Sequence, residues 1–142
     1  MVEQIIHGDK LLAIIIRSDF SKQGIEFFTP NNFSQQLGYM NRPKGYVIEP
    51  HRHNLVPREV VQTQEVLLIR SGKVRVDFYD DDQHYYESKE LNPGDVILLA
   101  AGGHGFEMLE PSEMIEVKQG PYVSERDKVR FEPVSPEIIK VK

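Results

Sequence analysis

Two histidines separated by one residue are the feature of this sequence with the clearest chemical potential. His51 and His53 lie in a segment that we expect to be a strand, so both imidazoles should leave the sheet on the same side. Their Cα atoms would then be about 6 to 7 Å apart, and both rings could bind one metal ion. Such a pair alone is weak evidence for a metal site, because it is more often two exposed or hydrogen-bonded histidines.

The surroundings of this pair contain further spaced residues. Segment 45–53 reads Gly, five residues, then His-x-His, and segment 65–72 reads Glu, six residues, then Gly. Segment 93–104 runs from Pro-Gly through an apolar stretch and a Gly-Gly corner to a histidine. At these residues the chain resembles the cupin superfamily, over about 45–108. The resemblance implies a single small antiparallel β-barrel, or jelly roll, and says little about the reaction because such folds carry many functions.

The resemblance also implies a ligand set for one divalent transition metal (Fe, Mn, Ni, Co, Cu or Zn). Neutral imidazoles and a carboxylate suit these ions, and three nitrogens with one oxygen leave coordination positions for water, substrate or dioxygen. The ion would keep a net positive charge and would stabilise an anionic or enolisable ligand. The residues at the motif positions are His51, His53, Glu65 and His104.

The identity of the carboxylate ligand has two candidates. Eleven residues, 54–64, separate the histidine pair from Glu65, which is more than cupins usually have there, so Glu59 is a rival. Glu65 is favoured because it alone keeps the motif's distance to Gly72.

Short runs of β-branched and aromatic residues between Gly, Pro and Asp turns are typical of an all-β domain with a sandwich or barrel architecture. Ser71-Gly72-Lys73 has the composition of a tight hairpin turn. We find no linker or repeat and predict one domain, residues 1–142, whose tail, 128–142, packs outside the barrel. The expected strands are 11–16, 25–29, 33–41, 46–53, 65–70, 73–79, 84–91, 96–100, 104–109 and 114–119.

Alternation in two of these strands suggests which side chains face the interior. Phe106 and Met108 share a face with His104. Both could line the site or simply pack in the core. In the last strand the pair at 115 and 117 is apolar and the pair at 116 and 118 is charged. We expect the apolar pair inside, because a charged pair inside would require a functional role.

Composition excludes several classes of protein. The 142 residues carry 17 Lys and Arg against 22 Asp and Glu, a formal charge of −5, without the basic stripe of a nucleic-acid binder. The longest apolar run, 11–16, is too short to span a membrane, and the start of the chain lacks a secretory pattern. With no cysteine there is no disulfide or thiolate chemistry, which fits a cytoplasmic location. The acidic run 80–82 lacks the ligand spacing of a calcium loop.

Two classes of function remain open. As an enzyme the protein could be a metal-dependent oxygenase, or an isomerase acting on a sugar or small acid, with Glu49, Glu59 or Glu116 moving protons. As a binding module it would hold or sense a small polar molecule without turnover. A metal-free, sugar-handling barrel is the third alternative. The resemblance also implies a homodimer, and open sheet edges would favour pairing as well.

Overall fold

Ten β-strands and two short 3-10 helices make up the regular structure of the computed structural model, which describes residues 1–142. The prediction of an all-β protein is confirmed. No helix is long and apolar enough to cross a membrane. The elements are β1 (Val2–His7), β2 (Lys10–Ile16), β3 (Gly24–Phe27), β4 (Gly38–Asn41), β5 (Glu65–Ser71), β6 (Val74–Tyr79), β7 (Tyr85–Leu91), β8 (Val96–Leu99), β9 (Gly103–Met108), β10 (Glu113–Lys118), η1 (Ser124–Asp127) and η2 (Pro136–Ile138).

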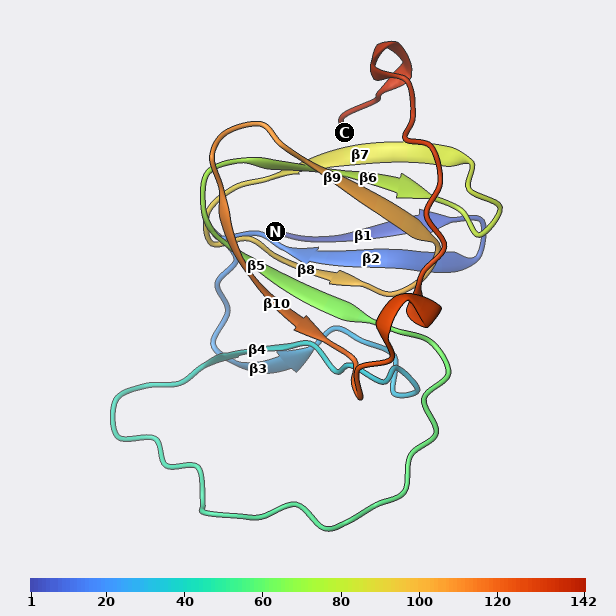
Figure 1. Cartoon of the computed structure of the whole chain (residues 1–142). Helices are drawn as coiled ribbons and strands as arrows, with labels where there is room; N and C mark the ends of the chain where they lie inside the picture. The colour runs from blue at the N-terminus through green and yellow to red at the C-terminus, as the bar shows by residue number, and fades with distance from the viewer.

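The strands form two facing sheets and one separate hairpin, and all the strand pairs are antiparallel (Figure 1). One sheet has five strands in the order β1-β2-β8-β5-β10, and the other has three in the order β7-β6-β9. The β3–β4 hairpin lies below the five-stranded sheet in Figure 1, on the side away from the three-stranded sheet.

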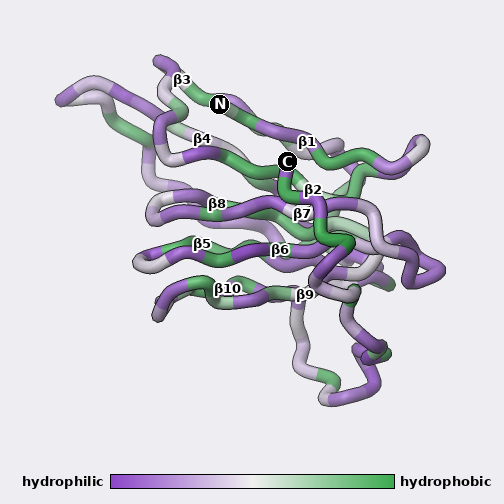
Figure 2. The backbone as a smooth tube through the Cα atoms, turned by 90° about the horizontal axis from the view of Figure 1, so that it is seen from above, coloured by the Kyte–Doolittle hydropathy of each residue, from purple (hydrophilic) through white to green (hydrophobic).

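The core fills the space between the two sheets. Ile15 and Ile97 from the five-stranded sheet are fully buried and belong to the same apolar cluster as Val76 and Phe78 of β6. Alternation along the strands produces this layer, because every second side chain points to the same face. Figure 2 shows the alternating hydropathy most clearly along β5 and β10.

The turn at Gly72 does not make a hairpin, contrary to the prediction. β5 pairs with β8 and β10, whereas β6 pairs with β7 and β9, so the chain crosses at this turn from one sheet to the other. Gly72 has φ +85°, and a Cβ there would lie 2.3 Å from the carbonyl oxygen of Pro111. The glycine is needed because the crossing turn packs on the β9–β10 connection. Sequence composition identifies such a turn but not the sheet that follows it.

Residues 42–64 form a long extended segment without a strand, which we call the arm. The prediction of a strand at 46–53 is therefore wrong for this structure. A strand exists only where its backbone pairs with another strand, and residues 46–53 pair with no strand of their own chain. Figure 1 shows the arm passing below the β3–β4 hairpin and returning to β5.

Two further differences concern the first strands. β1, which pairs with β2 along its whole length, was absent from the predicted set. The expected strand at 33–41 forms only at Gly38–Asn41, because the Gln36 side chain bonds the carbonyl oxygens of Pro30 and Phe33 and so stabilises a turn.

Candidate functional site

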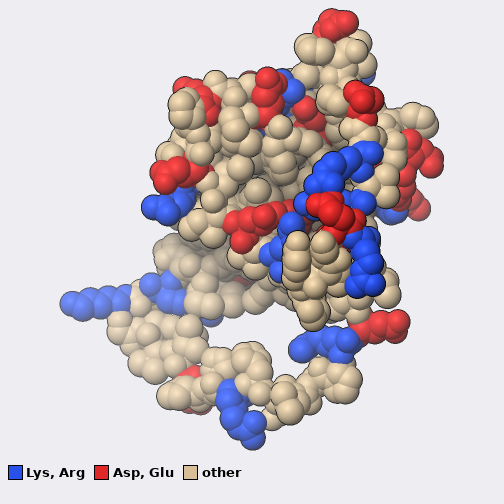
Figure 3. Space-filling view, viewed as in Figure 1, with Lys and Arg blue, Asp and Glu red and all other residues tan.

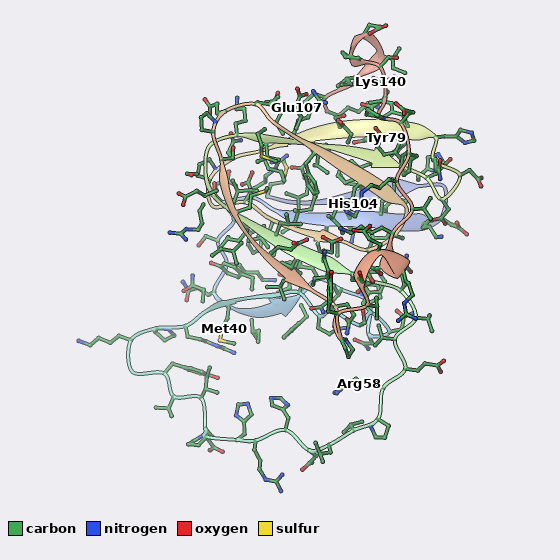
Figure 4. All side chains as sticks on the ribbon, viewed as in Figure 1. Met40, Arg58, Tyr79, His104, Glu107 and Lys140 are labelled. Atoms are coloured by element: carbon green, nitrogen blue, oxygen red, sulfur yellow. The ribbon has the colours of Figure 1, made fainter.

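Glu65 and His104 meet at the ends of two strands from different sheets. The Oε1 atom of Glu65, the first residue of β5, lies 3.5 Å from Nε2 of His104, near the start of β9. Both side chains are largely shielded, with 13% and 27% of their surfaces exposed. Figure 4 shows His104 inside the body of the molecule, near Tyr79. The structure thus brings together two of the four residues expected to bind a metal.

A glycine corner directs His104 toward Glu65. Gly102 has φ +68°, a conformation that few other residues adopt, and a Cβ there would lie 2.4 Å from the carbonyl oxygen of Tyr79. At Gly103 a Cβ would contact Phe131 at 2.9 Å. The two glycines let the chain turn tightly against β6, so that β9 begins with the His104 ring beside β5.

The charged pair of β10 faces this site, which corrects our expectation that Ile115 and Val117 would point inward. Glu116 hydrogen-bonds Glu65, and Lys118 lines the same cavity. Ile115 and Val117 are instead 46% and 53% exposed.

The reason is that the outer face of the five-stranded sheet is also apolar. Across that face Val117 pairs with Val66, and Val66 pairs with Leu98, which is fully buried. The apolar residues of β10 continue this outer row. When both faces of a sheet carry apolar side chains, alternation alone cannot identify the inner face.

The two carboxyl groups of the site have opposite proton affinities. The His104 imidazole lowers the pKa of Glu65 to about 2, although burial acts in the opposite direction, and the hydrogen bond from Glu116 lowers it further. The same hydrogen bond raises the pKa of Glu116, since its proton is held between the two groups, and burial raises it as well. The site therefore favours the ionised form of Glu65 and the protonated form of Glu116.

A cavity of about 760 Å³ is lined by the side chains of Glu65, His104 and Glu116. Its wall includes Phe106, whose ring centroid lies 5.6 Å from that of His104, and Phe131 from the C-terminal segment. Met108, the other residue expected on this face, is 44% exposed and does not line the cavity.

Basic side chains stand at the mouth of the cavity. Lys118 lies 3.7 Å from Glu116, Lys128 makes no ion pair within 4.0 Å, and Arg130 is paired with Glu125. Figure 3 shows basic and acidic groups gathered beside η1, where this mouth lies. The contribution of the C-terminal segment had no signal in the sequence, because its position depends on packing against β6 and β9.

The remaining predicted ligands lie elsewhere. His51 and His53 are exposed residues of the arm, with ring centroids 5.4 Å apart, and Nδ1 of His51 contacts the carbonyl oxygen of Glu49 at 2.8 Å. The rival ligand Glu59 is also exposed on the arm and lines a different cavity from His104. The middle of the arm lies far from the three-stranded sheet, as Arg58 and His104 illustrate in Figure 4, whereas its last residues, 61–63, line the same cavity as His104.

The donor set thus fits a divalent ion only in part. Glu65 and His104 offer one oxygen and one nitrogen to a common point, whereas a catalytic transition-metal site commonly has about three protein ligands. The other two nitrogens of the predicted four-residue set, those of His51 and His53, lie on the arm.

A second group of possible ligands lies at the β6–β7 turn. Ligand atoms of Asp80, Asp82 and His84 lie within 4.8 Å of one another. Asp80 accepts hydrogen bonds from the backbone N–H groups of Asp82 and His84, both at 2.9 Å, so its carboxylate organises the turn. His84 is exposed.

Comparison with known proteins gives no match among protein-family models, curated proteins or solved structures. The function must therefore be argued from the side chains.

Proposed function

We propose that this chain is a cupin-like barrel that binds one divalent transition metal and holds a small polar, carboxylate- or sugar-like ligand in the Glu65–His104 cavity. The observation that carries the proposal is the meeting of a carboxylate and an imidazole, distant in sequence, inside one cavity. His51 and His53 would complete the ligand set. When bound, the metal would polarise an oxygen of the ligand.

The other residues of the cavity suit a ligand with negative charge. Lys118 and Lys128 can neutralise a carboxylate at the mouth, while Phe106 and Phe131 offer apolar contact to its carbon skeleton. The pKa of Glu116 is raised by its contact with Glu65, so Glu116 is the candidate to donate a proton to a ligand oxygen. The absence of cysteine favours a reducing compartment such as the cytoplasm.

A metal-free acid–base site is the second candidate, and the Glu65–Glu116 pair favours it. Two carboxyl groups whose surroundings separate their proton affinities are typical of an acid and a base acting on one substrate. In that case Glu116 would give a proton and Glu65 would accept one, as in an isomerase or epimerase.

Calorimetric titration of tag-free, chelator-treated protein with Zn²⁺ and Mn²⁺ tests the first candidate. We expect one ion per chain, and about tenfold or greater loss of affinity in Glu65→Gln and His104→Ala, because each change removes a ligand. Glu107→Gln, on the exposed part of β9, is the matched control and should bind as the unaltered protein does.

Small ligands separate the two candidates. Malonate should raise the melting temperature of the metal-loaded protein more than that of the chelated protein, and Lys128→Ala should reduce the effect. Equal stability and equal malonate binding with and without metal would refute the metal site and leave the acid–base pair as the function.

A further inference from the structure

The three-stranded sheet has one open edge, and that edge belongs to the strand of the site. β9 pairs with β6 along one side and with no strand along the other. The outer edge of β7 is covered by the C-terminal tail, since the Ser88 N–H donates to the Lys140 carbonyl at 2.8 Å and the Lys142 N–H donates to the Ser88 carbonyl at 2.9 Å. The unpaired N–H and C=O groups of β9 can accept a further strand.

The arm is an extended chain whose apolar side chains have nothing to pack on. Val47 is 74% exposed and Leu55 fully exposed, and Tyr46, Ile48 and Val56 are each at least half exposed. Loops of this length without structure are uncommon in compact domains, and a folded monomer rarely leaves so many apolar groups in water. The arm therefore has the composition of a segment that is buried in a larger assembly.

The charges of the arm and of the remaining chain are complementary. Residues 42–64 contain four basic residues (Lys and Arg) and two acidic residues (Asp and Glu). The rest of the chain contains thirteen basic and twenty acidic residues. Figure 3 shows basic side chains along the arm and mixed, largely acidic groups on the body. A basic arm is attracted to an acidic surface.

The base of the arm indicates that the surface belongs to a second copy of this chain. The arm leaves β4 beside Ile25, Phe27 and Met40, which are each about half exposed on the hairpin. In Figure 1 most of the arm lies below the β3–β4 hairpin and away from β9 of its own chain, and only its last residues, 61–63, reach the cavity beside β9. A second copy placed against the hairpin would cover these side chains together with the arm, whereas folding the arm back onto its own β9 would leave them in water.

We propose that two copies exchange their arms, so that residues 46–53 of each copy add as a strand to the free edge of β9 in the other. The inference rests on the proposed metal site, because it states where the missing ligands come from. Residues that alternate on a strand point to one face, and directly opposed residues have Cβ atoms about 5 Å apart. The added His-x-His can therefore meet His104 and Glu65 on the cavity side of the sheet. Each metal site would then contain residues of both copies.

The first experiment measures the mass in solution by light scattering after size exclusion, with no metal present. The unaltered chain should have twice the mass of 16.4 kDa. Pro50 lacks an N–H, so residues 48 and 50 of the added strand must face away from β9, and residues 47 and 49 donate to it. Val47→Pro therefore removes a pairing donor and should shift the protein toward the monomer, while its fold is kept because Val47 is 74% exposed. Asn54→Ala, an exposed and uncharged position on the arm outside 46–53, is the control and should remain dimeric.

The second experiment uses mixed dimers with different affinity tags on the two copies. One copy carries His104→Ala and the other carries His51→Ala with His53→Ala. If the arms are exchanged, one intact set of four ligands forms in each mixed dimer, so Zn²⁺ titration should give one tight site per dimer. If each arm serves its own chain, the mixed dimer has no intact set and should give none.

These outcomes separate the two proposals. A monomeric protein that binds metal would overturn arm exchange and keep the metal site. The same conclusion would follow if the unaltered dimer had two tight sites and the mixed dimer had none. A dimer that Val47→Pro leaves intact would also overturn arm exchange. An unaltered dimer that binds no metal but dissociates with Val47→Pro would support the exchange and overturn the proposed function.

Discussion

The ionised form of Glu65 should make a measurable, pH-dependent contribution to stability. The pKa of this carboxyl is about 2 in the folded protein against an ordinary value of 4.5. A lowered pKa means that folding favours the carboxylate, so the contribution is complete above about pH 5 and is lost as the pH falls toward 2. We therefore expect metal-free protein to lose this contribution between pH 5 and pH 2.

The size of the effect follows from the two pKa values. The difference between 4.5 and about 2 corresponds to about 3 kcal/mol in full, of which about 2 kcal/mol should be lost by pH 3. The side chain is only 13% exposed, so solvent screening removes little of this energy.

The measurement compares Glu65→Gln with its parent in a Glu116→Gln background, where the neighbouring amide cannot titrate but still donates to Glu65. Urea unfolding in the presence of a chelator is followed by tyrosine fluorescence, which is available because the chain has six Tyr and no Trp. The difference in unfolding free energy between the two proteins should fall by about 2 kcal/mol from pH 6 to pH 3.

Parallel pH profiles of the two proteins would refute the reasoning, because they would mean that Glu65 titrates alike in the folded and unfolded states. Glu107→Gln serves as the control. Its carboxylate is 60% exposed and lies outside the cavity, so this variant shows how much of any change arises from the loss of a surface carboxylate alone.

Three further substitutions test the fold. Phe78→Ala should lower the unfolding free energy by about 3 to 5 kcal/mol, because the ring is 1% exposed in the core. Its control, Phe27→Ala at a 59% exposed position, should lower it by less than about 1 kcal/mol. Urea titration measures both unfolding free energies. Asp95→Ala should cost about 3 kcal/mol in the same assay, since this buried carboxylate accepts two backbone N–H groups and pairs with a guanidinium. Gly102→Ala should lower stability by about 1 to 3 kcal/mol and shift the His104 ring signals in NMR spectra, and unchanged signals would contradict the role of the glycine corner.

Local patterns in the sequence determined most of the strands from β5 onward and the places where the chain turns. Alternation along 74–79 and the apolar run 11–16 predicted β6 and the interior of β2, because a strand with one or two buried faces has a distinctive composition. The spacing of glycines and histidines also selected Glu65 and His104, which the structure places 3.5 Å apart.

Only the tertiary structure decided which surfaces those strands share. The turn at Gly72 leads to the opposite sheet, and Glu116 faces the cavity while Ile115 faces outward, because both depend on which strands pair and which layers cover them. The residues around His51 have a strand-like composition, yet they form no strand in one chain, since backbone pairing requires a partner that local sequence cannot supply.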